Sequence, residues 1–466
     1  MSDLFKKERI IWIMKKNNQM DMSTTQVIMF GFLITILVGS VLLALPISSA
    51  NGNAVPFLDA LFTATSATCV TGLVTLPVVT TWSLFGQIVL LLLIQIGGMG
   101  VITIMSGLMI LLNKRIGIMD RVLIQDAFNL NSLSGLVRFV KKVIMGTLLV
   151  EGVGAVLYMF VFVPEYGAKG IWISVFTSVS AFCNAGIDLI SENSLCDYVF
   201  HPLINVVTSI LIILGGLGYI VWWDVIRVIK NWKHWRGKCF RHLSLHSKIA
   251  ISATLILIFV GAVAFYLFEY NNPKTMQDYT VWQRIEVSLF QSITTRTAGF
   301  ATIPQQNLSN ASAIVSVLLM FIGGSPVGTA GGIKTVTAAV LVATMIAAVR
   351  NKDEVSFFGR DITRKTIAKA VAVMSMSFII LFVSTVMLSA VTDADALDVL
   401  YETASATATV GLTRNLTGSL NAWGKMIIIV TMYLGRIGPI SLAVAFNTKK
   451  ESPNIVRNPV EEISIG

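Results

Sequence analysis

One stretch near the end of the chain decides the fold, and it reads Ser405-Ala406-Thr407-Ala408-Thr409-Val410-Gly411. Three earlier stretches share its run of small and hydroxyl residues ending in a glycine. They read Ser66-Ala67-Thr68-Cys69-Val70-Thr71-Gly72, Ser180-Ala181-Phe182-Cys183-Asn184-Ala185-Gly186 and Ile293-Thr294-Thr295-Arg296-Thr297-Ala298-Gly299. The four glycines are separated by 114, 113 and 112 residues. Glycines that only pack helices have no reason to keep such a period, so the spacing indicates four tandem structural repeats.

The composition around these stretches is that of a membrane protein. Apolar residues make up 55% of the 466 residues, charged residues only 13%, and the mean hydropathy is +0.76. Soluble domains carry about 25% charged residues, whereas hydrocarbon penalises charge and favours long apolar runs. The net charge of +10 then reflects basic loops that orient the chain and touch anionic lipid, and we expect no nucleic-acid partner.

The apolar runs predict how the chain crosses the bilayer. Eight runs are long enough to span it, at 27–48, 84–112, 140–163, 201–226, 248–269, 313–347, 367–391 and 424–446. Shorter apolar stretches suit re-entrant half-helices, and they lie at 56–67, 171–182, 283–295 and 396–407. The expected fold is an all-α integral membrane protein. It has four tandem helix–pore-loop–helix repeats, with eight full transmembrane helices and four pore half-helices around one pseudo-fourfold pore.

The boundaries and the orientation follow from the same runs. We place the four repeats between an N-terminal segment and a C-terminal tail, with bounds at 1–26, 27–113, 138–226, 248–347, 367–446 and 447–466. The segments expected on one side of the membrane hold 27 of the 35 Lys and Arg residues, and they are 1–26, 114–142, 227–248, 350–369 and 447–466. Basic loops stay inside, so both termini are expected in the cytoplasm.

The chemistry of the four glycine stretches points to a cation. Irregular backbone at membrane depth is tolerated where it lines a water-filled path, and a dehydrating cation needs oxygen ligands. Glycine permits the positive φ that turns successive carbonyls toward an axis. We call the last three residues of each stretch a filter segment. We expect a cation, K⁺, at the carbonyls of Val70, Thr71, Gly72, Asn184, Ala185, Gly186, Thr297, Ala298, Gly299, Thr409, Val410 and Gly411.

Two further features recur in register with the glycines. Small-residue motifs follow each one, at 97–100, 215–218, 323–326 and 435–438, and they allow backbones to approach closely. Asp59, Glu286 and Asp398 each stand thirteen residues before a filter glycine. An acid at the N-terminus of a short helix is favoured by the helix dipole, so we interpret these three as helix caps rather than as a cation funnel.

The third repeat contains a break in its second apolar run. Residues 321–334 hold five glycines and a proline, which cannot form a regular helix, and nothing comparable interrupts the other second runs. We call 321–334 the gating loop. Its candidate gate residues are Gly323, Gly324, Ser325, Pro326, Gly328, Thr329, Gly331 and Gly332. A passive kink between two half-helices is the alternative.

Arg436 is a lone basic residue deep in the last apolar run. A buried arginine in a membrane needs partners and marks a functional site by default. Its position after Gly411 places it just inside the filter, where we expect it to bond carbonyls of the gating loop and to slow cations. A snorkelling residue at the inner interface is the alternative.

These residues together resemble the Trk/Ktr/HKT superfamily of K⁺ transporters, over residues 27–446. Thr409-Val410-Gly411 also matches the start of the TVGYG filter of K⁺ channels. The length and the lack of an additional helix pair look most like the Ktr membrane subunit. In this superfamily each repeat contributes one filter glycine, and a serine at the first is associated with Na⁺ permeation, so Gly72 argues for K⁺.

The resemblance carries further expectations. It implies K⁺ uptake in the plasma (inner) membrane of a bacterium, with Na⁺ dependence. It implies a homodimer with one pore per chain on a cytosolic ring of nucleotide-binding regulatory subunits, and no covalently bound cofactor. It also implies that the gating loop and Arg436 control conduction. Whether the flux is passive or coupled to Na⁺ or H⁺ stays open.

Two other functions compete with this hypothesis. An alternating-access carrier of another small solute would use inverted repeats, but units with two full spans each repeat in parallel. An intramembrane enzyme would need a His, Glu or Asp cluster or a Ser/Lys pair at membrane depth, and the sequence offers no such pattern. We therefore expect that the chain is not an enzyme.

Overall fold

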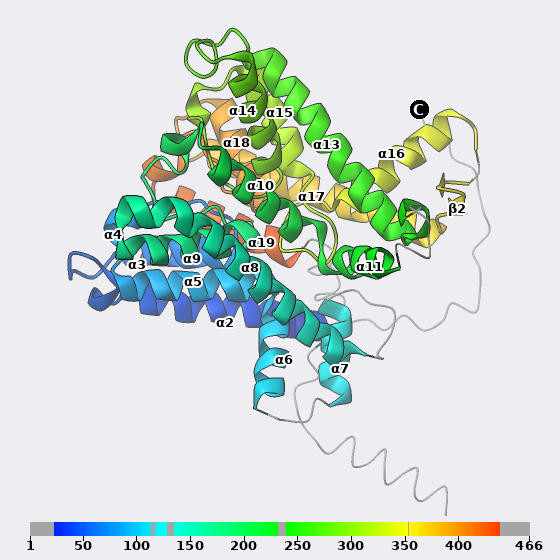
Figure 1. The fold of residues 1–466 in the computed structure, drawn as a ribbon, viewed down its shortest axis with the longest axis horizontal. Helices are drawn as coiled ribbons and strands as arrows, with labels where there is room; N and C mark the ends of the chain where they lie inside the picture. Colours follow the sequence, from blue (N-terminus) through cyan, green and yellow to red (C-terminus); the bar gives the residue numbers. More distant parts are fainter. Residues whose placement is uncertain (1–22, 113–116, 128–134, 232–238, 353, 439–466) are drawn as a thin grey trace, which may run out of the picture.

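The computed structural model describes residues 23–112, 117–127, 135–231, 239–352 and 354–438. The expected N-terminal segment up to residue 22, residues 439–446 of the fourth repeat and the tail 447–466 lie outside these described residues. Figure 1 shows a bundle of helices, several of them long. A two-stranded hairpin, β1 (Ser356–Phe357) and β2 (Arg360–Asp361), connects the third and fourth repeats.

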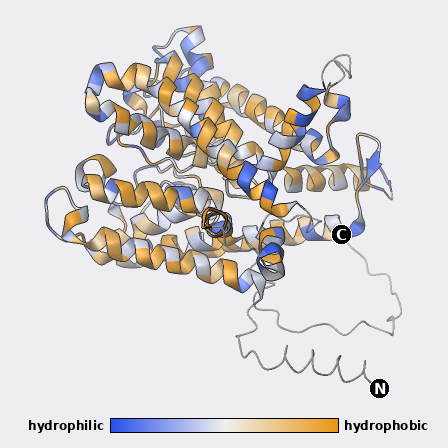
Figure 2. Ribbon diagram, turned by 60° about the horizontal axis from the view of Figure 1, so that its bottom comes forward, coloured by the Kyte–Doolittle hydropathy of each residue, from blue (hydrophilic) through white to orange (hydrophobic). Residues whose placement is uncertain are grey.

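Each repeat begins with one long helix. The four are α2 (Thr24–Ala44), α8 (Leu136–Tyr166), α13 (Leu245–Glu269) and α17 (Arg364–Ser389), and each is long and apolar enough to cross a membrane. Only 22–33% of their most apolar stretches is buried inside the protein. Figure 2 shows how continuous the apolar character of the helices is. Apolar faces that are so widely exposed suit contact with lipid.

A shorter, buried helix follows each long one. These pore helices are α3 (Phe57–Cys69), α9 (Ala168–Cys183), α14 (Val281–Thr294) and α18 (Ala396–Ala408). Their last two turns are almost fully buried, hydroxyl side chains included. Several of these hydroxyls donate to carbonyls one turn earlier, as Thr63 does to Asp59 and Thr403 to Val399. All four expected half-helices are therefore present.

The second helix of repeats 1 and 2 differs from the expectation of an unbroken span. It is bent by 101°, between α5 (Leu84–Met99) and α6 (Val101–Leu111) and between α10 (Pro202–Leu217) and α11 (Tyr219–Lys230). The bends lie at Gly100 and Gly218, whose φ of 85° ends the first helix of each pair. The expectation that only repeat 3 has a broken second helix was therefore wrong.

The remaining second helices belong to repeats 3 and 4. In repeat 3 most of the gating loop separates α15 (Asn310–Phe321) from α16 (Thr335–Val349). In repeat 4 the described part is α19 (Ala422–Ile437), which ends at Gly438 with a φ of 86°. The short elements of the described chain are η1 (Pro46–Ser48), α4 (Val78–Thr81), α7 (Ile118–Ala127), η2 (Cys196–Tyr198), η3 (Cys239–His242), η4 (Gln305–Asn307) and η5 (Thr417–Ser419).

The four repeats close into a ring. The second helix of each repeat packs on the pore helix of the next, so α5 contacts α9, α10 contacts α14, and α15 contacts α18. The ring closes where α19 contacts α3, which joins the end of the described chain to its beginning. This cyclic packing is the predicted pseudo-fourfold arrangement, and it brings the four pore helices around one axis.

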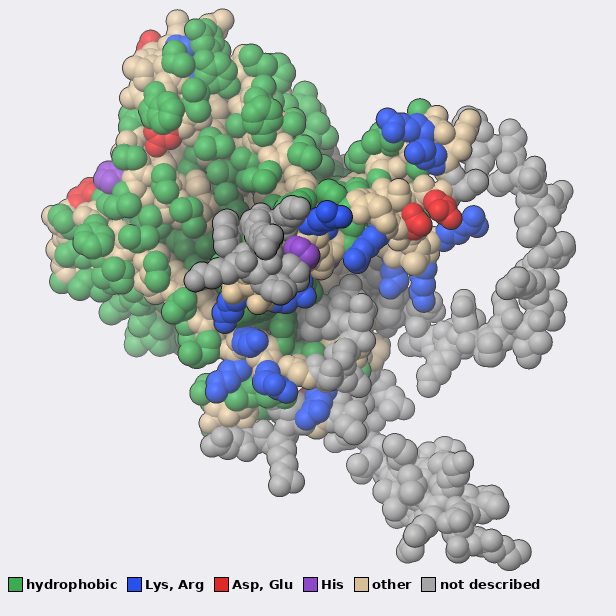
Figure 3. Space-filling view, turned by 45° about the vertical axis from the view of Figure 1, so that its right-hand side comes forward, with side chains coloured by type: hydrophobic (Ala, Val, Ile, Leu, Met, Phe, Trp, Pro, Cys, Tyr) green, Lys and Arg blue, Asp and Glu red, His purple; other side chains and the backbone are tan. Residues whose placement is uncertain are grey.

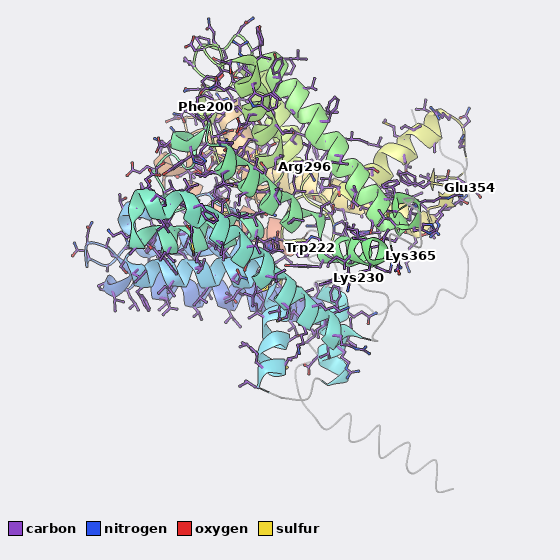
Figure 4. The ribbon with its side chains drawn as sticks, viewed as in Figure 1. Phe200, Trp222, Lys230, Arg296, Glu354 and Lys365 are labelled. Carbon is purple, nitrogen blue, oxygen red and sulfur yellow. The ribbon has the colours of Figure 1, made fainter. Side chains whose placement is uncertain are left out.

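Charge is separated from the apolar body. Figure 3 shows apolar side chains over the helical body, while the visible Lys and Arg side chains gather mainly at one end. Figure 4 places Lys230 and Lys365 at this end, well away from Arg296 in the interior. The separation agrees with the charge bias of the loops read from the sequence.

Candidate cation pathway

Each filter segment begins with a residue whose backbone φ is positive. Val70, Asn184 and Thr409 stand two residues before the glycines and cap α3, α9 and α18 with left-handed φ angles of 56°, 61° and 51°. Thr297 occupies the same position in repeat 3, with a φ of 81°. The filter glycines also have positive φ, between 64° and 100°. The filter segments therefore start from a similar backbone conformation in all four repeats, although α14 itself ends earlier, at Thr294.

The four filter segments meet one another in cyclic order. Each filter glycine faces the carbonyl that precedes the glycine of the next repeat, and the facing pairs are Gly72 with Ala185, Gly186 with Ala298, Gly299 with Val410 and Gly411 with Thr71. A Cβ built on Gly186 or Gly299 would lie only 2.6 Å from the carbonyl oxygen that it faces. The ring therefore has no room for side chains at these positions.

A serine fixes the filter segment in three of the repeats. It stands six residues before the glycine and accepts a hydrogen bond of 3.0–3.1 Å from a backbone amide of the segment or just beyond it, in the pairs Gly72–Ser66, Ile187–Ser180 and Gly411–Ser405. Repeat 3 has Ile293 at this position. Its backbone is held instead by the Thr294 hydroxyl, which donates to the Phe300 carbonyl at 2.6 Å.

Buried hydroxyls at the filter remain available for a ligand. Among the described residues, Thr71, Thr297 and Thr409 are fully buried and their hydroxyls have no hydrogen-bond partner. The hydroxyls of Thr68 and Thr407, four residues before filter glycines, are likewise unpartnered. Buried polar groups normally find partners, so this set of oxygens suits a cation or its water.

A cavity of about 350 Å³ opens on the outer side of the ring. All four filter glycines line it, together with Asp188 and Glu192, and no Lys or Arg of the described chain is among its lining residues. A low-dielectric cavity that carries negative but no positive charge concentrates cations. The ring thus opens into a cavity whose acidic side chains attract cations.

The gating loop lies under the ring and docks on the bend of repeat 2. The Ser325 amide donates to the Gly216 carbonyl at 2.7 Å, and the Tyr219 amide donates to the Val327 carbonyl at 3.1 Å. The bend between α10 and α11 thereby supplies free backbone groups that the loop, which is not helical, can pair with. This accounts for polar backbone that would otherwise be unpaired at membrane depth.

Thr329 joins the gating loop to the second filter segment. Its hydroxyl donates to the Phe182 carbonyl at 3.1 Å and accepts from the Asn184 side chain at 2.8 Å. On the opposite side of the ring, Gly331 packs against the end of α18, where a Cβ would collide with the Thr409 hydroxyl. The loop therefore crosses beneath the filter from repeat 2 to repeat 4.

Arg436 holds this loop from the last described helix. It donates at 2.6 Å to the Thr329 carbonyl, and its other terminal nitrogen donates to the Gly97 carbonyl of α5. It lines an inner cavity of about 290 Å³ together with Lys334, which donates to the Ala330 carbonyl at 2.5 Å. The guanidinium therefore contacts repeat 1 and repeat 3 from repeat 4, which is not the position of a snorkelling side chain.

The three acids before the filters are not capping groups. The helix caps are Pro56, Thr280 and Asp395; Asp59 and Asp398 lie in the first turn, three residues after the caps, and Glu286 lies six residues after its cap. Their partners are Lys425 at 2.5 Å from Asp59, Asn205 at 3.0 Å from Glu286, and Arg414 at 2.6 Å from Asp398. The interpretation as caps is therefore corrected, since two of the three bonds tie one repeat to another.

Three buried charged residues were missed by the sequence arguments. Glu151 of α8 is 4% exposed and accepts from Gln95 at 3.1 Å, and Glu402 of α18 is fully buried and accepts from Thr413 at 2.6 Å. Arg296, in the third glycine stretch, is 8% exposed. A charged residue inside an apolar run or a small-residue motif was the available signal for all three.

Comparisons with known proteins agree with this geometry. A family described as TrkH, cation transport protein, matches residues 7–458. The chain is 38% identical to Ktr system potassium uptake protein B of Bacillus subtilis, over 95% of this chain and 96% of that protein. It is 37% identical to the potassium/sodium uptake protein NtpJ of Enterococcus hirae, over 97% and 100% of the two chains.

A solved structure shows the same fold. The potassium transporter TrkH from Vibrio parahaemolyticus superposes with a TM-score of 0.70 at 17% identity, over 93% of this chain and 87% of that chain. These matches confirm the resemblance drawn from the four glycine stretches and the helical membrane fold. They also confirm that the chain belongs with transport proteins and not with enzymes. The chain therefore belongs to the TrkH family of cation transport proteins.

Proposed function

We propose that this protein takes up K⁺ through the ring formed by its four filter segments. The observation that carries the proposal is the cyclic order in which each filter glycine faces the carbonyl of the next repeat. Such a ring offers backbone oxygens from four sides, which is what replaces the water of a dehydrating cation. Two of the relatives are named as potassium uptake proteins, one of them also for sodium.

The twelve residues of the filter segments are the proposed ligand set. Their carbonyls would hold K⁺, and the unpartnered threonine hydroxyls would contact the ion or its water on the inner side. K⁺ rather than Na⁺ is proposed because Gly72 stands where a serine is associated with Na⁺ permeation in the superfamily that the chain resembles. Dependence on Na⁺ is part of the proposal and is supported by the name of the relative from Enterococcus hirae.

The gating loop and Arg436 are the proposed gate. The loop crosses beneath the filter and is fastened to repeat 2 through Thr329, while Arg436 fastens it to repeats 1 and 4. Conduction requires the loop to leave this position, which breaks the bonds to Thr329. The guanidinium and the Lys334 ammonium also place positive charge in the inner cavity, which opposes cations there.

We propose a bacterial plasma-membrane location with both termini in the cytoplasm, because the basic end marks the inner side. The chain would act as a homodimer, surrounded by membrane lipid, on a cytosolic ring of nucleotide-binding subunits. The support is the relative from Bacillus subtilis, which is named as a protein of a Ktr system. The repeat boundaries and the terminal segments given from the sequence are kept as part of this proposal.

A complementation experiment tests the function. The chain is expressed in a bacterial strain lacking K⁺ uptake, with and without cognate cytosolic subunits, and growth at low K⁺ is measured. We expect rescue by the parent and a loss of K⁺ over Na⁺ selectivity in Gly72→Ser. The matched control is Gly418→Ser, because a Cβ at Gly418 meets no atom within 4 Å.

The possible outcomes separate the proposal from its competitors. Rescue by the parent and by Gly418→Ser, with altered selectivity in Gly72→Ser, supports K⁺ conduction through the ring. Failure of the parent to rescue, although it reaches the membrane and cytosolic subunits are supplied, contradicts K⁺ uptake. Equal selectivity of the two serine variants contradicts the placement of the filter.

A further inference from the structure

The third filter segment carries a feature that the other three lack. Three residues before the filter glycine, repeats 1, 2 and 4 have the small residues Cys69, Cys183 and Ala408, all of them fully buried or nearly so. Repeat 3 has Arg296 at this position, and its side chain is also buried, with 8% exposed. Figure 4 shows Arg296 in the interior of the helical body. A guanidinium therefore stands directly behind one of four otherwise similar filter segments.

The partners of Arg296 are few and distant. Its terminal nitrogens donate to the carbonyl and the hydroxyl of Thr254 at 3.5 Å and to the Gly323 carbonyl at 3.4 Å. Its Nε has no partner among the described residues. Hydrogen bonds of this length are weak, and a guanidinium has five donors to satisfy. The side chain can therefore strengthen or release these bonds with small movements of its neighbours.

The bond to Gly323 connects Arg296 with the gating loop. Gly323 is the third residue of the gating loop and directly follows Ile322, the residue that caps the C-terminus of α15. Arg296 and Gly324 line the same small cavity, against Gly216 at the bend of repeat 2. Arg296 thus connects two parts of the pathway. It directly precedes Thr297 of the third filter segment, and its side chain bonds Gly323 of the gating loop.

The local backbone makes the third segment more dependent on this bond. Ile293 stands where the other repeats have the serine that bonds the filter backbone, so no hydroxyl clamp exists at that position. The pore helix α14 also ends at Thr294, two residues earlier relative to its glycine than α3, α9 and α18. In repeats 1, 2 and 4 a serine holds the backbone of the filter segment. In repeat 3 the bonds of Thr294 and Arg296 take its place.

We propose that Arg296 is a positioning residue that couples the third filter segment to the gating loop. With the loop beneath the filter, the Gly323 carbonyl holds the guanidinium and thereby the backbone that leads into Thr297. When the loop leaves, this anchor is lost and the third segment shifts, so the opening of the gate and the geometry of one filter wall change together. The inference rests on the proposed function and names the residue through which selectivity for K⁺ over Na⁺ depends on the gate.

The test measures two quantities in liposomes that contain the full chain: the K⁺ flux and the ratio of K⁺ to Na⁺ permeability. Arg296→Gln is expected to raise the flux and to lower the permeability ratio about tenfold, which corresponds to about 1.4 kcal/mol. Arg296→Lys keeps the positive charge but loses the planar set of guanidinium donors. Its permeability ratio is expected to lie between those of the parent and of Arg296→Gln. Arg436→Gln releases the loop that carries Gly323, so it should raise the flux and lower the ratio as well.

Two further variants distinguish coupling from a structural role. Ile293→Ser together with Arg296→Gln supplies the missing hydroxyl, and it should recover the permeability ratio without recovering the low flux. Arg284→Gln removes a guanidinium from the other end of α14, where it bonds Met276 and Gln277, and it should change neither quantity.

The outcomes decide the inference separately from the proposed function. An unchanged ratio in Arg296→Gln, or no recovery with Ile293→Ser, overturns the coupling. If Arg296→Gln fails to reach the membrane, Thr254→Val decides, because it removes one acceptor and keeps the guanidinium. It should lower the ratio by a smaller factor, and an unchanged ratio overturns the inference. A parent protein without K⁺ flux would instead contradict the proposed function.

Discussion

Repeats 1, 2 and 4 pack their second helices on their own pore helices, whereas repeat 3 does not. In the three similar repeats, the first glycine of the second motif lies against the carbonyl four residues before the filter glycine, in the pairs Gly97–Thr68, Gly215–Phe182 and Gly435–Thr407. The corresponding Gly323 lies against the Gly331 carbonyl of its own loop. Repeats 1, 2 and 4 therefore share one packing contact, and repeat 3 has exchanged it for a contact within its own gating loop.

The largest effect is expected where all four repeats behave alike, at the ring itself. Gly411→Ala places a Cβ against the Thr71 carbonyl at a φ of 100°, so one filter wall must shift. We expect K⁺ uptake to fall to the level of cells without the protein, measured as initial uptake rate. Gly418→Ala is the control from the same repeat. Near-normal uptake by Gly411→Ala would show that the ring is not the conduction path.

The next largest effect is expected at the contact between Arg436 of repeat 4 and the gating loop of repeat 3. Arg436→Ala removes charge-assisted bonds to the Thr329 and Gly97 carbonyls, each worth about 1.5–3 kcal/mol. We expect K⁺ flux in liposomes to rise at least about tenfold, since a shift of about 1.4 kcal/mol in the gate equilibrium suffices. Deleting 323–331 should also raise the flux. An unchanged or lower flux in properly folded variants would contradict a gate at this place.

A smaller effect tests the serine clamp on which the comparison depends. Ser405→Ala removes the acceptor of the Gly411 amide, a bond with a net worth of about 1 kcal/mol. We expect the ratio of K⁺ to Na⁺ permeability to fall about fivefold, because about 1.4 kcal/mol corresponds to a factor of ten. Ile293→Val, at the same position of repeat 3, should leave the ratio unchanged. Equal permeability ratios in the two variants would contradict the claim that the serine hydroxyl fixes the filter segment.

The smallest effect concerns the closure of the ring between repeats 4 and 1. Asp59 and Lys425 are 2.5 Å apart, and their side chains are only 12% and 17% exposed. A double-mutant cycle with Asp59→Asn and Lys425→Met should give a coupling of about 1 kcal/mol in the free energy of unfolding. Thermal unfolding in detergent measures it. A coupling near zero would mean that helix packing alone closes the ring.

The repeats and the filter glycines could be predicted from the sequence because their cause is local and recurs. Where four backbones converge there is no room for a Cβ, so Gly72 and Gly411 must be glycine, and the period makes that requirement visible. The bends at Gly100 and Gly218 could not be predicted in this way. A single glycine in an apolar run looks the same whether it packs against a helix or ends one.

Arg296 was hidden for a different reason. It lies inside a motif that was recognised by its small residues, and its partners Thr254 and Gly323 are 42 and 27 residues away in the chain. No spacing in the sequence connects residues that meet only after α13, α14 and the gating loop have packed. The acids thirteen residues before the glycines were placed correctly on their helices, because their spacing to the glycines is local and recurs. Their partners on other elements could not be predicted from the sequence.

The location of the permeating ion tests the central claim most directly. Rb⁺ replaces K⁺ in many K⁺ sites and scatters X-rays anomalously, so crystals of the protein grown in Rb⁺ report where the ion binds. The account predicts anomalous density on the axis enclosed by Gly72, Gly186, Gly299 and Gly411. Rb⁺ density elsewhere in the protein, with none inside this ring, would contradict it.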